Sequence, residues 1–93
     1  MTGTGIVIVA WNAENVIGPC LDAAAAHCAN VVVVDNASSD ATREVVRQRG
    51  VTLIANPENR GFAAAANQGF AALDCPFILL LNPDALLATG TDA

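Results

Sequence analysis

Four short apolar runs recur along the chain and are separated by longer segments with helical periodicity. The runs are rich in valine, isoleucine and leucine, and polar residues do not alternate with the apolar ones. Strands that are apolar on both faces are typical of a buried parallel sheet. The pattern therefore predicts four strands, at residues 6–10, 31–34, 51–55 and 77–81.

Three helices are predicted in the intervals between these strands, at residues 16–28, 41–49 and 61–73. Strands that alternate with helices indicate right-handed crossovers, which place the helices on the faces of the sheet. We therefore expect an α/β fold, with an open parallel sheet of about four strands and flanking helices. In the third helix, the residues expected to face the sheet are Phe62, Ala66, Phe70 and Leu73.

Length and charge limit the classes of protein that fit. The 93 residues make one small domain at most. Four arginines and no lysines stand against nine acidic residues, which gives a net charge of −5 without any basic run. Counterion release requires clustered cations, so the composition disfavours nucleic acid and anionic membranes as partners.

The cysteines and the apolar runs exclude further classes. Three cysteines and a single histidine favour neither a zinc site nor a disulfide framework. The apolar runs are far shorter than the ~20 residues of a membrane-spanning helix, so we expect no transmembrane segment and a cytoplasmic location. The residues after Asp84 are too few to build a second half of the fold. We therefore expect residues 1–93 to form one partial, truncated domain.

Polar residues follow the predicted strands, and this is where a ligand is expected. Open parallel sheets bind ligands beyond the carboxyl ends of their strands. The sequence has no glycine-rich dinucleotide motif after its first strand, no phosphate-binding loop with a lysine and no nucleophile elbow. What remains is a set of carboxylates and amides, which can hold a nucleoside diphosphate if Mg²⁺ or Mn²⁺ offsets its charge.

Asp84 is the best candidate to bind that cation, because it follows the fourth strand. If the first strand lies between the second and the fourth, Asp35 and Asp84 stand about 10 Å apart on one rim. That separation suits a base at one end and a metal-bound diphosphate at the other. Each aspartate could instead only cap the helix that follows it, as we expect of Asp40.

Four segments, IVIVAWN, VVVVDNASSDAT, NPENRGFAAAANQG and FILLLNPDA, occur in this order along the chain. Their succession resembles the nucleotide-binding half of family 2 glycosyltransferases of the GT-A fold, closest to bacterial rhamnosyltransferase-like members. The resemblance covers residues 5–87. It implies transfer of a sugar from a nucleotide-diphospho-sugar to an acceptor hydroxyl, with inversion at the anomeric centre.

The resemblance assigns ten residues to the nucleotide-sugar site: Ala10, Trp11, Asn12, Glu14, Asp35, Arg60, Gly61, Asn67, Asn82 and Asp84. The first three would line the nucleoside pocket, with Glu14 just beyond. Asp35 would accept a hydrogen bond from the base. The residues from Arg60 to Asn67 would contact the nucleotide or shape the floor under it.

The segment Asn82-Pro83-Asp84 corresponds to the family's DxD motif. Asn82 would bond the ribose and Asp84 would coordinate Mg²⁺ or Mn²⁺. The chain departs from the commonest form of the motif, because an amide replaces the first carboxylate and brings one less negative charge to the cation.

The resemblance also implies partners. The donor would be linked to dTDP or UDP, and a glycan or lipid-linked acceptor would bind through the missing half, with the whole protein peripheral at the inner membrane. The family's general base lies in that half, so we expect donor binding without turnover. The alternative is a non-catalytic fragment that folds by domain swapping or forms a homo-oligomer through its exposed sheet edge.

Overall fold

The computed structural model describes residues 3–83 and contains four strands that alternate with three helices. In chain order the elements are β1 (Thr4–Ala10), α1 (Ile17–His27), β2 (Asn30–Asn36), α2 (Thr42–Gln48), β3 (Thr52–Asn56), α3 (Phe62–Ala72) and β4 (Phe77–Leu81). Every predicted element is present, with ends within two residues of the predicted ones. The sequence prediction of an α/β fold is confirmed.

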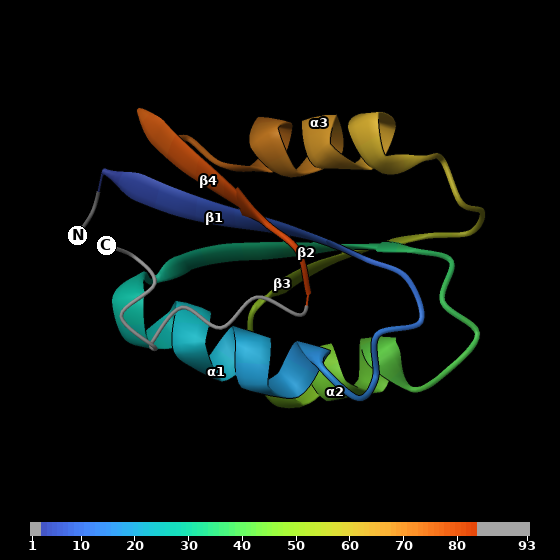
Figure 1. Cartoon of the computed structure of the whole chain (residues 1–93). Helices are drawn as coiled ribbons and strands as arrows, with labels where there is room; N and C mark the ends of the chain where they lie inside the picture. The colour runs from blue at the N-terminus through green and yellow to red at the C-terminus, as the bar shows by residue number, and fades with distance from the viewer. Residues whose placement is uncertain (1–2, 84–93) are drawn as a thin grey trace.

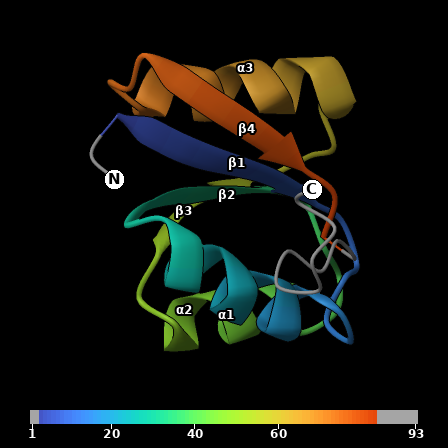
Figure 2. The same cartoon turned by 60° about the vertical axis from the view of Figure 1, so that its left-hand side comes forward.

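The four strands form one parallel sheet in the order β3-β2-β1-β4. Helices α1 and α2 cover one face of the sheet, and α3 covers the other (Figure 1). Figure 2 shows the same three layers from the side, with β4 at the edge of the sheet beside β1. Because β1 lies between β2 and β4, the condition for placing the ends of these two strands on one rim is met.

The main core lies between the sheet and the two helices α1 and α2. Its largest fully buried side chains include Ile8, Ile17, Leu21, Val33 and Val46. Each isoleucine or leucine removed from water in this way contributes about 1.5–3 kcal/mol to the free energy of unfolding. Within residues 3–83, no helix is long and apolar enough to cross a membrane.

The second core lies under α3, and the predicted apolar stripe is confirmed at Ala66 and Leu73 but was wrong at its two phenylalanines. Phe62 is 53% exposed and Phe70 is 36% exposed, whereas the buried residues of the helix are Ala65, Ala66 and Gly69. The reason is the close approach of α3 to the sheet, since a Cβ atom added to Gly69 would clash with the side chain of Val7. Small residues fit such a contact and phenylalanines do not.

Strand β4 is less buried than its sequence predicted. Phe77 is 71% exposed and Leu79 is 48% exposed, although both belong to an apolar run. Within the described part of the chain, β4 pairs only with β1, so its other edge has no strand partner. Burial of Phe77 and Leu79 would require another structural element packed against β4.

Candidate functional site at the carboxyl rim

The loops that follow β1, β2 and β3 lie on the right in Figure 1, and β4 ends beside β1. Ala10, the last residue of β1, pairs with Asp35 in β2, and Ile8 pairs with Leu81 at the end of β4. The sequence predicted this convergence. Ala10 itself is fully buried in the main core, so its side chain does not face the rim.

Two loops of the rim are joined by hydrogen bonds in both directions, and we call this set of contacts the loop clamp. Three consecutive N–H groups of the β1–α1 loop donate to side chains of the β2–α2 loop: Asn12 to Ser38 Oγ (2.8 Å), Ala13 to Thr42 Oγ1 (2.8 Å) and Glu14 to Asp40 Oδ2 (3.2 Å). In return, the N–H of Ser39 donates to Asn12 Oδ1 (2.8 Å) and the N–H of Ala41 to Glu14 Oε1 (2.9 Å). Asn12 Oδ1 and Glu14 Oε1, on two residues predicted near the nucleoside, are therefore engaged within the protein.

Asp40 caps the first turn of α2, as its position in the sequence predicts. Its Oδ1 accepts the N–H of Thr42 (2.9 Å) and also the hydroxyl of that residue. Desolvation acts to raise the pKa of Asp40, but the hydrogen bonds from Thr42 and from the N–H of Glu14 outweigh it and lower the pKa below its ordinary value. Asp40 is thus held as a carboxylate in the clamp.

Asp35 is fully buried and is held by two residues of the β2–α2 segment. Its Oδ1 accepts the hydroxyl of Ser38, and its Oδ2 accepts the N–H of the same residue at 3.0 Å. Arg43 Nε lies 3.3 Å from Oδ2, and the Arg43 Nη2 donates to the carbonyl of Ser38 at 2.9 Å. A carboxylate offers about four acceptor positions, so roughly one remains. The sequence analysis did not identify Ser38 or Arg43, because nothing in the local pattern shows that they turn back onto Asp35.

The ends of β2 and β3 carry an amide network that the sequence analysis also missed. Asn36 Oδ1 accepts Asn56 Nδ2 at 3.1 Å, and Asn56 exchanges two hydrogen bonds with Gln68 of α3, at 2.7 and 2.9 Å. Both asparagines are only 3% exposed. Within the described residues, no buried side-chain nitrogen or oxygen is left without a partner. The signal in the sequence was an asparagine at the end of each of two adjacent strands.

The same network fixes the start of α3. Asn36 accepts the N–H of Arg60 (3.2 Å) and donates to the carbonyl of Gly61 (3.1 Å). Gly61 has φ = 83°, a backbone conformation that favours glycine, and its N–H donates to Asn59 Oδ1 at 2.8 Å. Asn67 is exposed and makes no side-chain hydrogen bond within residues 3–83, whereas its neighbour Gln68 joins the amide network.

Arg60 differs from the other arginines of the chain. Arg43, Arg47 and Arg49 pair with carboxylates, whereas the guanidinium of Arg60 has no partner among the described residues. The pairing of Arg60 with the nearby Glu58, which would have made it a simple surface residue, is not formed. An exposed cation at this rim is available to a negatively charged ligand.

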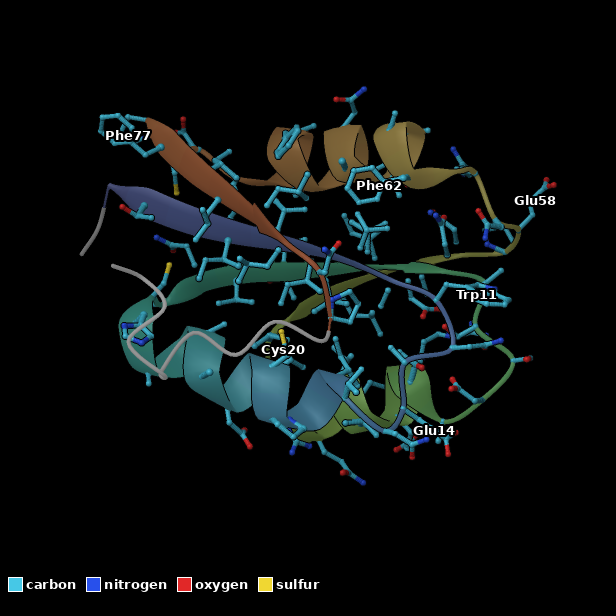
Figure 3. All side chains as sticks on the ribbon, in the orientation of Figure 1. Trp11, Glu14, Cys20, Glu58, Phe62 and Phe77 are labelled. Atoms are coloured by element: carbon cyan, nitrogen blue, oxygen red, sulfur yellow. The ribbon has the colours of Figure 1, made fainter. Side chains whose placement is uncertain are left out.

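An open groove of about 440 Å³ lies between the end of β1 and the end of β4. Its lining residues are Trp11, Asn12, Ala13, Val16, Asn82 and Pro83. Trp11 is 58% exposed, and Figure 3 shows it at the same end of the molecule as Glu58. The structure thus brings Trp11 and Asn82 together from opposite ends of the sequence, as predicted.

The predicted cation ligand, Asp84, lies outside the described residues. Residues 3–83 contain no group of three or more histidine, cysteine, aspartate or glutamate side chains that could hold a metal ion. The carboxylates of Asp35 and Asp40 face protein donors. Carboxylate and phosphate oxygens are the donors that Mg²⁺ and Mn²⁺ prefer, and the assignment of the cation to Asp84 stays a prediction from the sequence.

Over residues 5–92 the sequence matches the family described as glycosyl transferase family 2. The match covers nearly the whole chain and includes all four loops of the rim. The chain therefore belongs to glycosyl transferase family 2. No curated protein sequence matches it significantly.

Solved structures show the same fold. Glucosyl-3-phosphoglycerate synthase from Mycobacterium tuberculosis superimposes with a TM-score of 0.79 in its complex with UDP, at 19% sequence identity over 90% of this chain. Its complex with Mn²⁺, UDP-glucose and phosphoglyceric acid and its complex with Mg²⁺ and UDP give the same TM-score, identity and coverage of this chain. The chain spans about a third of the length of these proteins, 34% in each case. The similarity identifies the fold as that of GT-A glycosyltransferases.

Proposed function

We propose that this chain is the donor-binding part of an inverting glycosyltransferase, which transfers a sugar from a UDP- or dTDP-linked donor to an acceptor hydroxyl. The observation that carries the proposal is the open groove between β1 and β4, where Trp11 and Asn82 face solvent beside one another. Family membership and the UDP complexes of the structural neighbours support a nucleotide sugar as the ligand.

The exposed groups of the rim suit the three parts of such a donor. The indole of Trp11 offers a flat surface on which a base can stack, and the amide of Asn82 can bond ribose hydroxyls. The free guanidinium of Arg60 can pair with phosphate oxygens. For the base N–H we propose the remaining acceptor position of Asp35, which requires a local side-chain shift because that residue is buried.

We propose that a divalent cation bound by Asp84 accompanies the donor. It would offset the charge of the diphosphate, which this chain, with no lysine and one free arginine among its described residues, does little to neutralise. Complexes of the structural neighbours with Mn²⁺ or Mg²⁺ support this choice. A glycan or lipid-linked acceptor would bind through a part of the protein outside this segment, and the general base would lie there too, so we expect binding without sugar transfer.

Calorimetric titration of the 93-residue chain with UDP, and separately with dTDP, tests this function. We expect binding in the presence of Mn²⁺ and a large loss of affinity when EDTA replaces it. Asp84→Asn should reproduce that loss in the presence of Mn²⁺. Asp22→Asn is the matched control, because Asp22 is exposed and pairs with Arg49 away from the rim.

Two results would contradict the proposal. One is the absence of binding by a sample whose circular dichroism shows it to be folded. The other is binding that is equally tight with and without Mn²⁺, which would remove the cation and leave only a nucleotide-binding module.

A second candidate function is self-association without ligand binding, and the exposure of β4 favours it. Phe77 and Leu79 present apolar surface beside a strand edge that has no partner within residues 3–83. Edges of this kind pair readily with other chains. Light scattering distinguishes the two candidates: a monomer that binds UDP supports the first, and an oligomer that does not bind supports the second.

A further inference from the structure

We propose that Ser38 is a positioning residue that sets the place of the Trp11 indole relative to the Asp35 carboxylate. The inference rests on the proposed function, since Trp11 and Asp35 are the two groups assigned to the base. Ser38 lies 27 residues from Trp11 in the sequence, and neither the family motifs nor the local pattern assigned it a part in the site.

The hydroxyl of Ser38 makes two hydrogen bonds, one as acceptor and one as donor. Ser38 Oγ accepts the N–H of Asn12, the residue next to Trp11, at 2.8 Å. The same hydroxyl donates its proton to Asp35 Oδ1. A hydroxyl has one proton and can accept as well as donate, so both contacts are made at once. One buried oxygen therefore joins the strand end that carries Trp11 to the carboxylate at the end of the neighbouring strand.

The side chain of Trp11 has few other restraints. It is 58% exposed, and its indole N–H makes no hydrogen bond within residues 3–83. The ring is held chiefly through its own backbone, which continues into Asn12 at φ = 47°. Asparagine tolerates this left-handed conformation better than most residues, and here both its N–H and its Oδ1 are engaged by the β2–α2 loop.

The remaining hydrogen bonds of the loop clamp also hold the loop that carries Trp11. Glu14 accepts the N–H of Ala41 and gives its own N–H to Asp40. Figure 3 shows Glu14 beside the start of α1, on the side of the sheet that carries α1 and α2. Its carboxylate is exposed but is used inside the protein. Glu14 therefore supports the loop that carries Trp11.

The only tryptophan of the chain is Trp11, and there is no tyrosine, so intrinsic fluorescence reports on this one side chain. Time-resolved fluorescence anisotropy without nucleotide measures how freely the indole moves. We expect Ser38→Ala to increase the amplitude of the fast motion and to weaken UDP binding in Mn²⁺ about tenfold, because a mobile indole must then be ordered on binding.

A second variant guards against misfolding, because Ser38 is buried. Glu14→Ala opens the clamp from its exposed side, and we expect the same change in anisotropy with a loss of affinity of about threefold. Glu14→Gln keeps an oxygen that accepts the N–H of Ala41 and should restore both measurements. Glu44→Ala, the same substitution at a surface pair on α2, is the matched control and should change neither.

Unchanged anisotropy in Ser38→Ala and Glu14→Ala, with circular dichroism showing folded protein, would overturn the positioning of Trp11. So would a loss of rigidity in Glu14→Gln equal to that in Glu14→Ala. If the anisotropy changes as expected but no variant, nor the parent chain, binds UDP, then the proposed function fails while the positioning of Trp11 is supported.

Discussion

The two halves of the carboxyl rim use their polar groups differently. In the half formed by β2 and β3, Asp35, Asn36 and Asn56 are at most 3% exposed, and each has protein partners. In the half formed by β1 and β4, Trp11 and Asn82 are exposed and line an open groove. A ligand is recognised by side chains whose hydrogen-bonding groups or apolar surfaces are not already used within the protein. We infer that the first half is chiefly a scaffold and that the second is the receptive surface for the proposed donor.

The largest expected effect comes from breaking the scaffold at its buried charge. Arg43→Met leaves the fully buried carboxylate of Asp35 without its cation, and we expect the free energy of unfolding to fall by about 3 kcal/mol. Arg47→Met is the control, because its pair with Glu44 is exposed on both sides and should cost less than about 1 kcal/mol. Urea denaturation followed by Trp11 fluorescence measures both. Equal losses in the two variants would show that the buried pair is not special.

A smaller loss is expected where α3 meets the sheet, next to the Gln68 that completes the amide network. Gly69→Ala should destabilise the chain by about 2 kcal/mol, because the added methyl group clashes with Val7. Gly18→Ala is the matched control: its new methyl group crowds the flexible end of Arg49 and makes an ordinary contact with Val45, so we expect a change within about 1 kcal/mol. Thermal denaturation compares the two. A gain of stability in Gly69→Ala would mean that α3 does not approach the sheet this closely.

The receptive half should respond in the opposite way, with a loss of binding and little loss of stability. Trp11→Ala removes the surface on which a base stacks, and we expect UDP affinity in Mn²⁺ to fall about tenfold. Because the side chain is 58% exposed, the unfolding free energy should change by less than about 0.5 kcal/mol. Calorimetry and circular dichroism provide the two measurements. A loss of stability comparable to that of Gly69→Ala would place Trp11 with the scaffold.

The smallest effect concerns the pH dependence of the clamp between the two halves. The pKa of Asp40 is lower in the folded chain than its ordinary value of 3.8, so the unfolded chain binds a proton more readily. The stabilisation from Asp40 is therefore fully present above about pH 4 and is lost as the pH falls through the folded pKa. Asp40→Asn should remove this part of the acid sensitivity in thermal melts between pH 2 and pH 5. An identical pH profile in the variant would show that the carboxylate contributes nothing to the clamp.

The fold could be predicted because its main signal is local. Four apolar runs give the strands, and the segments between them give the helices, so the predicted ends lie close to the observed ones. The face of α3 could not be predicted in this way. Its pattern shows which residues are apolar, but the distance between helix and sheet decides that Ala65 and Gly69, and not Phe62 and Phe70, lie against the strands.

The candidate site divides in a similar manner. Residues at strand ends, such as Trp11 and Asn82, could be placed on one rim because parallel strands end on the same side. Contacts between loops could not be predicted, since they depend on strand order and on side-chain direction. Ser38 meets Asn12, and Gln68 meets Asn56, only after the chain has folded. A short sequence window around Ser38 or Gln68 does not contain these distant partners.

The pairing of β1 with β4 sets an order for assembly. Thr4 lies beside Phe77, so β1 gains its second neighbour only after residue 77 has been made, whereas β2 joins β1, and β3 joins β2, through short crossovers. Closing so long a loop is entropically costly and slow. We infer that, during synthesis on the ribosome, β1, β2 and β3 form a three-stranded layer before β4 docks and completes the groove.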